Sequence, residues 1–269
     1  MTTSQDHRDL IRLRADWNVL AAADPLWAVC VTPEAKNGGW DPEAFYATGV
    51  AEVSATLARA AELGLPAAGG RALDLGCGVG RLTRALAEHC DLVVGVDIAP
   101  QMVELASRWN PYPDHCEFRL NDAPDLGMFG DATFDLVVSS IVLQHMPEAL
   151  IRTHLREFAR VLRPGGVLLF NLPTRAKLTT ARGLAFRYAP RAVVAWAQRK
   201  LLGYPAPMEM NGLAEAEVRA LLDAAGVDVV AADPLDNCAM WHHRQYFARR
   251  RAVPRGRRVP TQVPVGWGA

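Results

Sequence analysis

The sequence predicts an α/β fold in which a seven-stranded, mostly parallel sheet lies between two layers of helices. Short apolar runs alternate with amphipathic helical stretches from residue 71 onward, which favours parallel strands joined by crossover helices. The first of these runs leads directly into a glycine-rich turn. The last two runs, 227–231 and 240–248, are separated by too few residues for a crossover, so we expect an antiparallel final strand.

Composition is compatible with one large domain and excludes several other classes of protein. Half of the 269 residues are hydrophobic, and 29 basic residues balance 29 acidic ones, so nothing favours a nucleic acid or a membrane as partner. The five cysteines contain no C-x-x-C pair, which argues against a disulfide framework or a structural zinc site. No apolar signal-peptide core follows Met1. We therefore expect a cytoplasmic protein without a metal.

Two helices are expected before the sheet. Apolar residues at helical spacing predict the first over 10–20, and Asp41-Pro42 is a typical start for the second, which ends near Gly64. Neither helix can bury its apolar face alone. Residues 1–68 are therefore predicted to form a lid on the domain that follows, 69–250.

The stretch 71–81 contains a strand ending in Asp74-Leu75, then Gly76, Gly78 and Gly80, then the start of a helix. Glycines suit such a turn because they allow positive φ and let a ligand approach the backbone. A dinucleotide-binding turn requires a small residue where Arg81 stands, so NAD or FAD is disfavoured.

Four more strands follow in order, over 92–97, 116–120, 134–139 and 167–172. Proline opens the helices between them at Pro100 and Pro147, and 163–166 is predicted to be a sharp turn before the fifth strand. Residues 173–210 break the alternation with an insertion whose single helix is expected over about 184–202. The arginine- and proline-rich residues 251–269 are predicted to be a flexible basic tail.

These motifs, in this order, resemble those of class I S-adenosylmethionine (SAM) dependent methyltransferases over about residues 71–249. The resemblance implies a Rossmann-like three-layer sandwich and SAM as cofactor. It also implies that the insertion caps the acceptor pocket. By the same resemblance, the acid after the second strand, Asp97, holds the ribose of SAM. The alternative for Asp97 is a cap on the helix at Pro100. The other residues that we predict to bind SAM are Asp74, Gly76, Gly78, Gly80, Arg81, Ile98, Asn121, Asp122, Ala123, Ser139 and Leu143.

His145 lies on the loop after the fourth strand, at the edge of the sheet where ligands bind in such folds. Its ordinary pKa near 6.5 suits a general base, so His145 is the candidate catalytic residue, and a role in shaping the pocket is the alternative. Adjacent strand residues point to opposite faces, so His242-His243 is not read as a metal pair.

The function expected from the resemblance is methyl transfer from SAM. The neutral net charge and the aromatic residues of the lid and the insertion favour a small, rather apolar acceptor, and oxygen is the favoured acceptor atom. Carbon or nitrogen as the acceptor atom remains open. A macromolecular acceptor such as tRNA, docked by the arginine tail, is a further alternative. So is a SAM-binding regulator without turnover.

Overall fold

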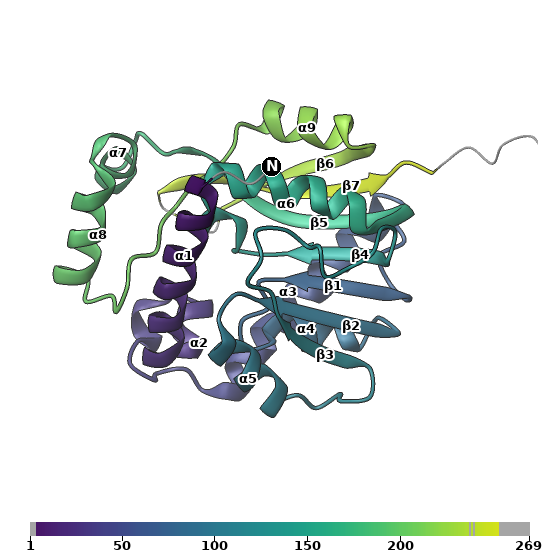
Figure 1. The fold of residues 1–269 in the computed structure, drawn as a ribbon, viewed down its shortest axis with the longest axis horizontal. Coiled ribbons are helices and arrows are strands. Elements are labelled where there is room, and N and C mark those ends of the chain that lie inside the picture. The colour runs from purple at the N-terminus through teal and green to yellow at the C-terminus, as the bar shows by residue number, and fades with distance from the viewer. Residues whose placement is uncertain (1–3, 237, 239, 253–269) are drawn as a thin grey trace, which may run out of the picture.

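The computed structural model describes residues 4–236, 238 and 240–252. Its centre is a seven-stranded sheet with the strand order β3-β2-β1-β4-β5-β7-β6 (Figure 1). The strands are β1 (Arg71–Leu75), β2 (Leu92–Asp97), β3 (Cys116–Leu120), β4 (Phe134–Ser139), β5 (Leu162–Ala176), β6 (Val227–Leu235) and β7 (Trp241–Arg250).

Strand direction agrees with the prediction. β1 pairs in parallel with β2 and β4, and β4 pairs in parallel with β5. β7 is antiparallel to both of its neighbours, β5 and β6. The carboxyl ends of β1, β2, β4 and β5 therefore lie along one edge of the sheet, and the amino end of β7 joins them there.

Strand β5 is much longer than predicted at both ends. Residues 163–166 belong to β5 and do not form a turn before it. Leu162 already pairs with Phe134 of β4, and a bulge lies between this pair and the next one, Val167 with Leu136. Gly165 has φ 85°, which lets the chain bulge without leaving the ladder. At the other end β5 continues to Ala176, opposite Trp241 of β7. The predicted insertion therefore begins as sheet.

The helices cover the sheet and its carboxyl edge. They are α1 (Ser4–Ala23), α2 (Pro25–Val29), α3 (Pro42–Glu62), α4 (Arg81–Ala87), α5 (Pro100–Arg108), α6 (Glu148–Val161), α7 (Ala181–Tyr188), α8 (Arg191–Lys200) and α9 (Glu215–Ala224), with 3₁₀ turns η1 (Pro33–Ala35) and η2 (Leu143–His145). The predicted start of α3 is confirmed, because the Asp41 carboxylate accepts from the Ala44 N–H at 2.8 Å. None of the described helices is both long and apolar enough to cross a membrane.

The insertion carries two helices where one was expected. α7 ends at Tyr188 and α8 begins at Arg191, because Pro190 has no N–H to donate within a continuous helix. Figure 1 shows this pair standing apart from the sheet, beyond α1. The division into lid, SAM-binding domain, acceptor cap and tail remains a prediction, and residues 253–269 of the predicted tail lie outside the described residues.

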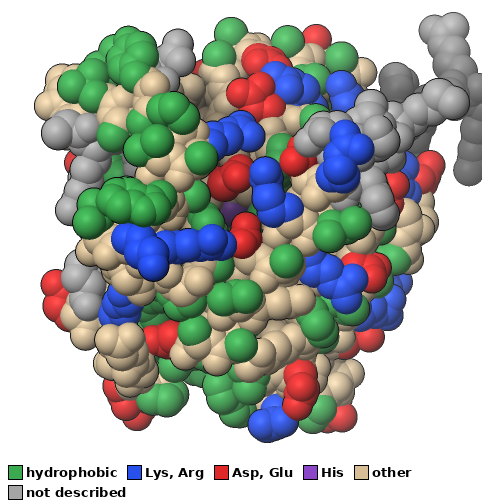
Figure 2. All heavy atoms as spheres, turned by 60° about the vertical axis from the view of Figure 1, so that its left-hand side comes forward, with side chains coloured by type: hydrophobic (Ala, Val, Ile, Leu, Met, Phe, Trp, Pro, Cys, Tyr) green, Lys and Arg blue, Asp and Glu red, His purple; other side chains and the backbone are tan. Residues whose placement is uncertain are grey.

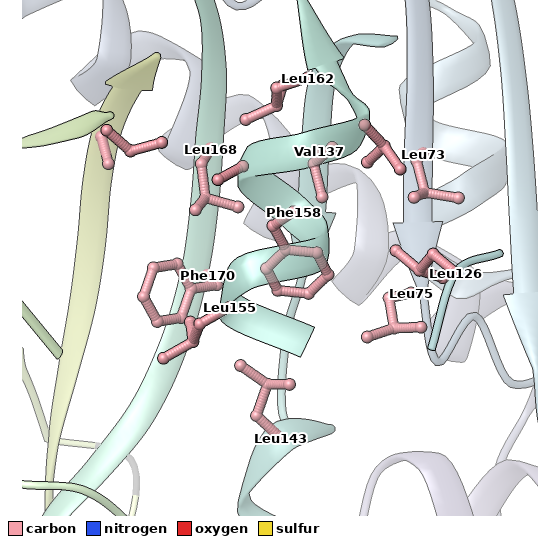
Figure 3. Close-up of a cluster of buried hydrophobic side chains, with 14 of the residues drawn as sticks. Leu73, Leu75, Leu126, Val137, Leu143, Leu155, Phe158, Leu162, Leu168 and Phe170 are labelled. Carbon is pink, nitrogen blue, oxygen red and sulfur yellow. The ribbon is translucent and has the colours of Figure 1, made fainter. Parts of the chain in front are cut away.

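Each face of the sheet has its own apolar core. One core joins β1, β4 and β5 to α6 and α9, with Phe158, Leu155 and Phe170 at its centre (Figure 3). The other joins the opposite face to α3 and α4. A third cluster packs Leu20, Trp27 and Phe45 of the N-terminal helices against Val79 and Met102 near the carboxyl edge. The N-terminal segment is thereby fixed over the ends of β1 and β2.

Helix α3 packs closely on α4 at Gly49. A Cβ on Gly49 would collide with the carbonyl oxygen of Arg81, the first residue of α4. The Arg81 side chain fills the space between the helices and is only 3 % exposed. Gly49 of α3 is therefore the small residue that allows this close approach. Arg81 occupies the position in α4 where a dinucleotide-binding turn would require a small residue.

Candidate functional site

The glycine turn after β1 adopts the backbone that its sequence requires. Gly76, Gly78 and Gly80 have φ values of 75°, 53° and 84°. The N–H groups of Gly76 and Cys77 donate to the Val96 carbonyl at 2.8 and 3.0 Å, which ties the turn to the end of β2. Residues with a Cβ would be strained at these angles, so the turn depends on glycine.

The outer side of this turn is covered by two valine side chains. A Cβ on Gly76 would collide with Val142, and one on Gly78 would collide with Val29 of α2. The glycines therefore keep the backbone open to a close neighbour, as a cofactor site needs. In this structure Val29 and Val142 are those neighbours.

Asp74 and Arg81, both predicted to bind the cofactor, are buried beside the turn. The Thr83 hydroxyl donates to the Asp74 carboxylate at 2.7 Å, and burial raises the pKa of Asp74 to about 6. The Arg81 guanidinium donates to Glu52 of α3 at 2.7 Å. Glu52 also accepts from the Ser140 hydroxyl at 2.5 Å, so these groups brace the turn against α3 and the β4 loop.

Asp97 faces the glycine turn from the end of β2. Its carboxylate accepts from the Gly78 N–H at 2.8 Å and from the Ala99 N–H at 2.9 Å. The Ile98 N–H also acts on this carboxylate. Because a carboxylate accepts about four hydrogen bonds, a position remains for a ribose hydroxyl. Ala99, without a side-chain bond, is the N-cap of α5, so Asp97 does not cap that helix. Its geometry fits the predicted nucleoside contact, with Ile98 beside it and partly buried.

The segment after β3 comes next to Asp97. The Asn121 N–H donates to the Asp97 carbonyl at 2.9 Å, and the Asn121 side chain accepts from the Ala123 N–H at 3.3 Å. Asp122 forms an ion pair with Arg14 of α1 at 3.0 Å. The structure thus gathers Asn121, Asp122 and Ala123 with Asp97 under α1.

Two other predicted cofactor residues point into the interior. The Ser139 hydroxyl is fully buried and donates to the Leu75 carbonyl at 3.2 Å. Leu143 is fully buried in the core beneath α6 (Figure 3). The structure therefore does not bring these two side chains to the site with the others.

His145 is held at both ring nitrogens. Its Nδ1 lies 2.7 Å from the Glu209 carbonyl, which can only accept, so Nδ1 carries the proton. Nε2 then accepts from the Gln144 amide at 3.2 Å. The edge of the Trp17 ring in α1 packs on the imidazole, with centroids 5.1 Å apart. Burial lowers the pKa of His145 to about 4, so the ring is neutral at pH 7.

Sequence reasoning missed the residues that connect the site to the lid and the insertion. Glu52, Arg14 and Val29 come from the N-terminal helices, and Glu209 comes from the chain returning from α8. None of them belongs to a motif. The only sequence signal was the placement of the lid and the insertion near the acceptor.

The antiparallel β7 distinguishes this sheet from the all-parallel sheet of dinucleotide-binding dehydrogenases. Residues 73–170 match the family model of a methyltransferase domain. Together with the antiparallel β7, this match identifies residues 73–170 as part of a methyltransferase domain of the class I, SAM-dependent type, whose cofactor is SAM.

Two known methyltransferases are similar in sequence to part of this chain. The 2-methyl-6-phytyl-1,4-hydroquinone methyltransferase of Synechocystis is 38 % identical over 98 residues, which cover 36 % of this chain and 30 % of the relative. A ubiquinone biosynthesis O-methyltransferase of Xanthomonas campestris is 33 % identical over 117 residues, 43 % of this chain and 47 % of the relative. The similarity thus spans less than half of each of these relatives.

Among solved structures, the magnesium protoporphyrin IX methyltransferase of Synechocystis, which has S-adenosylhomocysteine (SAH) bound, superposes with a TM-score of 0.52. It is 25 % identical, and the match covers 76 % of this chain and 82 % of that one.

Proposed function

We propose that this protein transfers the methyl group of SAM to an oxygen atom of a small, rather apolar acceptor. SAM would supply an activated methyl group on a positively charged sulfur. The protein would supply alignment, which contributes roughly 7–11 kcal/mol in such displacements. Asp97 would hold the ribose, and the glycine turn would hold the methionine portion.

The observation that carries the choice of oxygen is the state of His145. With the proton fixed on Nδ1 by the Glu209 carbonyl, Nε2 is the nitrogen that can take a proton from a hydroxyl. The imidazole is neutral at pH 7, which a base requires. Trp17 provides an aromatic wall beside it. The relatives named for a hydroquinone and for ubiquinone O-methylation support an acceptor of this kind.

Cofactor binding is tested first, by calorimetry with SAH and NAD. We expect SAH to bind and NAD not to bind. Asp97→Ala should weaken SAH by roughly 10–100-fold, because one or two charge-assisted hydrogen bonds are lost. Circular dichroism confirms that the variant is folded. Unchanged SAH affinity in the folded variant would remove Asp97 from the site.

Turnover is tested with methyl-labelled SAM and a panel of phenols, hydroquinones, carboxylic acids and amines. Label in an ether-linked product supports the proposal. SAH binding without transfer to any compound of the panel would favour a regulator that binds SAM without turnover.

A further inference from the structure

Three polar side chains are buried beside His145 without partners for all of their polar atoms. Gln144 lies in η2, Asn211 follows the insertion, and His243 lies in β7, with exposed fractions of 7 %, 8 % and 4 %. Among the described residues, no hydrogen-bond partner is found for Gln144 Oε1, Asn211 Nδ2 or either ring nitrogen of His243.

Backbone contacts bring these three residues to one place. The Asn211 N–H donates to the Gln144 carbonyl at 2.7 Å. The next residue, Gly212, lies so close to Pro173 that a Cβ would collide with the Pro173 carbonyl. Pro173 stands directly opposite His243 in the β5–β7 ladder. The loop after β4, the chain leaving the insertion and the start of β7 therefore border one buried region.

Such a group of unpartnered atoms is costly for a folded protein. Each buried donor or acceptor without a partner costs about 1–3 kcal/mol. Folded proteins leave few of them, and apolar residues of the same shape would be more stable. Three residues from separate elements converge here, which indicates that a bound molecule completes their hydrogen bonds.

A cavity of about 620 Å³ opens beside His243. Many of the other residues that line it are charged, namely Arg175, Lys177, Glu215, Asp236 and Arg244. Its volume falls within the range of roughly 300–1,000 Å³ typical of small-molecule sites. Of the three unpartnered side chains, His243 is the one that borders this cavity, and Gln144 and Asn211 lie deeper.

The free atoms define the ligand. Asn211 Nδ2 donates, Gln144 Oε1 accepts, and a neutral histidine does one of each. None of the three residues carries a charge at neutral pH, since burial lowers the pKa of His243 to about 4. The part of a ligand that meets these three side chains must therefore be uncharged and must both donate and accept, as a hydroxyl group does.

We propose that Gln144, Asn211 and His243 bind the methyl acceptor, and that this acceptor is an uncharged ring carrying at least two hydroxyl or keto oxygens. One oxygen meets these three side chains while another faces His145. The proposal rests on the proposed function and narrows its substrate class to compounds such as hydroquinones.

The test compares 1,4-hydroquinone and 2-methyl-1,4-naphthohydroquinone with phenol, which lacks the second oxygen, using methyl-labelled SAM. His243→Phe should lower kcat/KM for the hydroquinones by about 10–100-fold, mainly through KM, because one or two hydrogen bonds are lost. Phenol should lose little, so the preference for two oxygens should disappear. SAH affinity should stay unchanged, and Tm should be equal or higher.

Two controls separate recognition from stability. Tyr246→Phe removes another buried, unpartnered hydroxyl from the core against Phe170, and should raise stability without changing kcat/KM. Asn211→Leu should reproduce the effect of His243→Phe. Arg191→Leu breaks the 3.3 Å bond from Arg191 to Asn211 but keeps the amide, so it should retain the preference for two oxygens.

The outcomes of the inference and of the proposed function are distinguishable. If SAH binds and hydroquinones are methylated, but His243→Phe and Asn211→Leu keep the wild-type preference, the recognition site is overturned and the methyltransferase stands. If SAH binds and phenol is methylated as well as the hydroquinones, the substrate class is wrong. If SAH does not bind, the proposed function itself fails.

Discussion

His145 receives its orientation from the insertion and its packing from the lid. The Glu209 carbonyl fixes the tautomer, Gln144 occupies Nε2, and Trp17 covers the ring. A base in this position must exchange the Gln144 hydrogen bond for one to the acceptor hydroxyl. Geometry therefore allows proton transfer only when the acceptor displaces that amide.

Replacement of His145 tests this role. If His145 removes the hydroxyl proton, His145→Ala should lower turnover by about 10²–10⁴ while SAH affinity stays the same. His89→Ala, at an exposed position, is the matched control and should have no effect. Because burial lowers the pKa of His145 to about 4, the wild-type rate should stay level through pH 6.5 and fall only toward pH 4. Nearly full turnover in His145→Ala would mean that alignment of the acceptor with the methyl group accounts for catalysis without a base.

At the scale of the elements, the contact of α3 with α4 decides how firmly the glycine turn is held. Gly49 lets α3 approach the start of α4, and Glu52, one turn further, then reaches Arg81. A larger residue at position 49 would separate the helices and lengthen that ion pair. Arg81 would remain buried with its charge less well compensated.

Gly49→Ala should therefore destabilise the protein. Alanine gains about 1 kcal/mol in helix propensity over glycine, whereas forcing a methyl group against backbone costs roughly 1–3 kcal/mol. We expect a net loss and a Tm lower by a few degrees. Ser54→Ala, on the exposed side of α3, should leave Tm within about a degree. Equal melting temperatures for Gly49→Ala and wild type would show that α3 can shift at no cost.

Most strands could be predicted because period-2 or continuous apolar runs are local signals. The extra length of β5 could not, because 163–166 has the composition of a turn and stays in the ladder only through pairing with a distant strand. The break at Pro190 was readable in the sequence and was missed because the apolar pattern continues across it. Gly49 lies within a predicted helix, but its contact with Arg81 is tertiary and has no local signal.

Some residues of the candidate site could likewise be predicted from the sequence, and others could not. The glycine turn, Asp97 and His145 belong to motifs at the ends of strands. Their location at the carboxyl edge of the sheet could therefore be predicted from their positions in the sequence. Gln144, Asn211 and His243 have no shared motif, since they meet only when β7 returns beside β5. Burial without partners is a property of the folded state. No spacing in the chain could reveal it.

For the whole molecule, zero net charge conceals an uneven surface. The described part of the insertion exposes large apolar side chains on α7 and α8, and hydrophobic residues stand out on this face in Figure 2. Residues 177–208 contain six basic residues and no acidic one. The balance of 29 and 29 therefore holds only for the chain as a whole.

Global stability should depend on pH through buried histidines. Burial lowers the folded-state pKa of His145 and His243 to about 4, and burial also lowers the pKa of His154. The unfolded chain has histidine pKa values near 6.5, so it binds more protons than the folded chain below that pH. The stability from these groups is complete above about pH 7 and declines as pH falls toward 4. Asp74, whose pKa is raised to about 6, opposes the decline from about pH 7 downward, because the folded chain binds this proton before the unfolded chain does.

We expect Tm to fall between pH 7.5 and 6, where the histidines dominate, and His243→Phe to reduce the slope. Scanning calorimetry across this interval measures both. A Tm that is constant over this pH interval, or a dependence of Tm on pH that is unchanged in His243→Phe, would contradict the lowered pKa values of the buried histidines.

The two valines that cover the glycine turn also bear on how fast the enzyme can work. With Val29 of α2 and Val142 lying on the turn, a cofactor that contacts the backbone of the turn would have to displace both side chains, and α2 would have to shift with Val29. Displacements of packed helices take microseconds to milliseconds, and such openings limit many enzymes more than chemistry does. Turnover would then respond to solvent viscosity, and a smaller residue at position 29 would release product sooner while holding it less tightly.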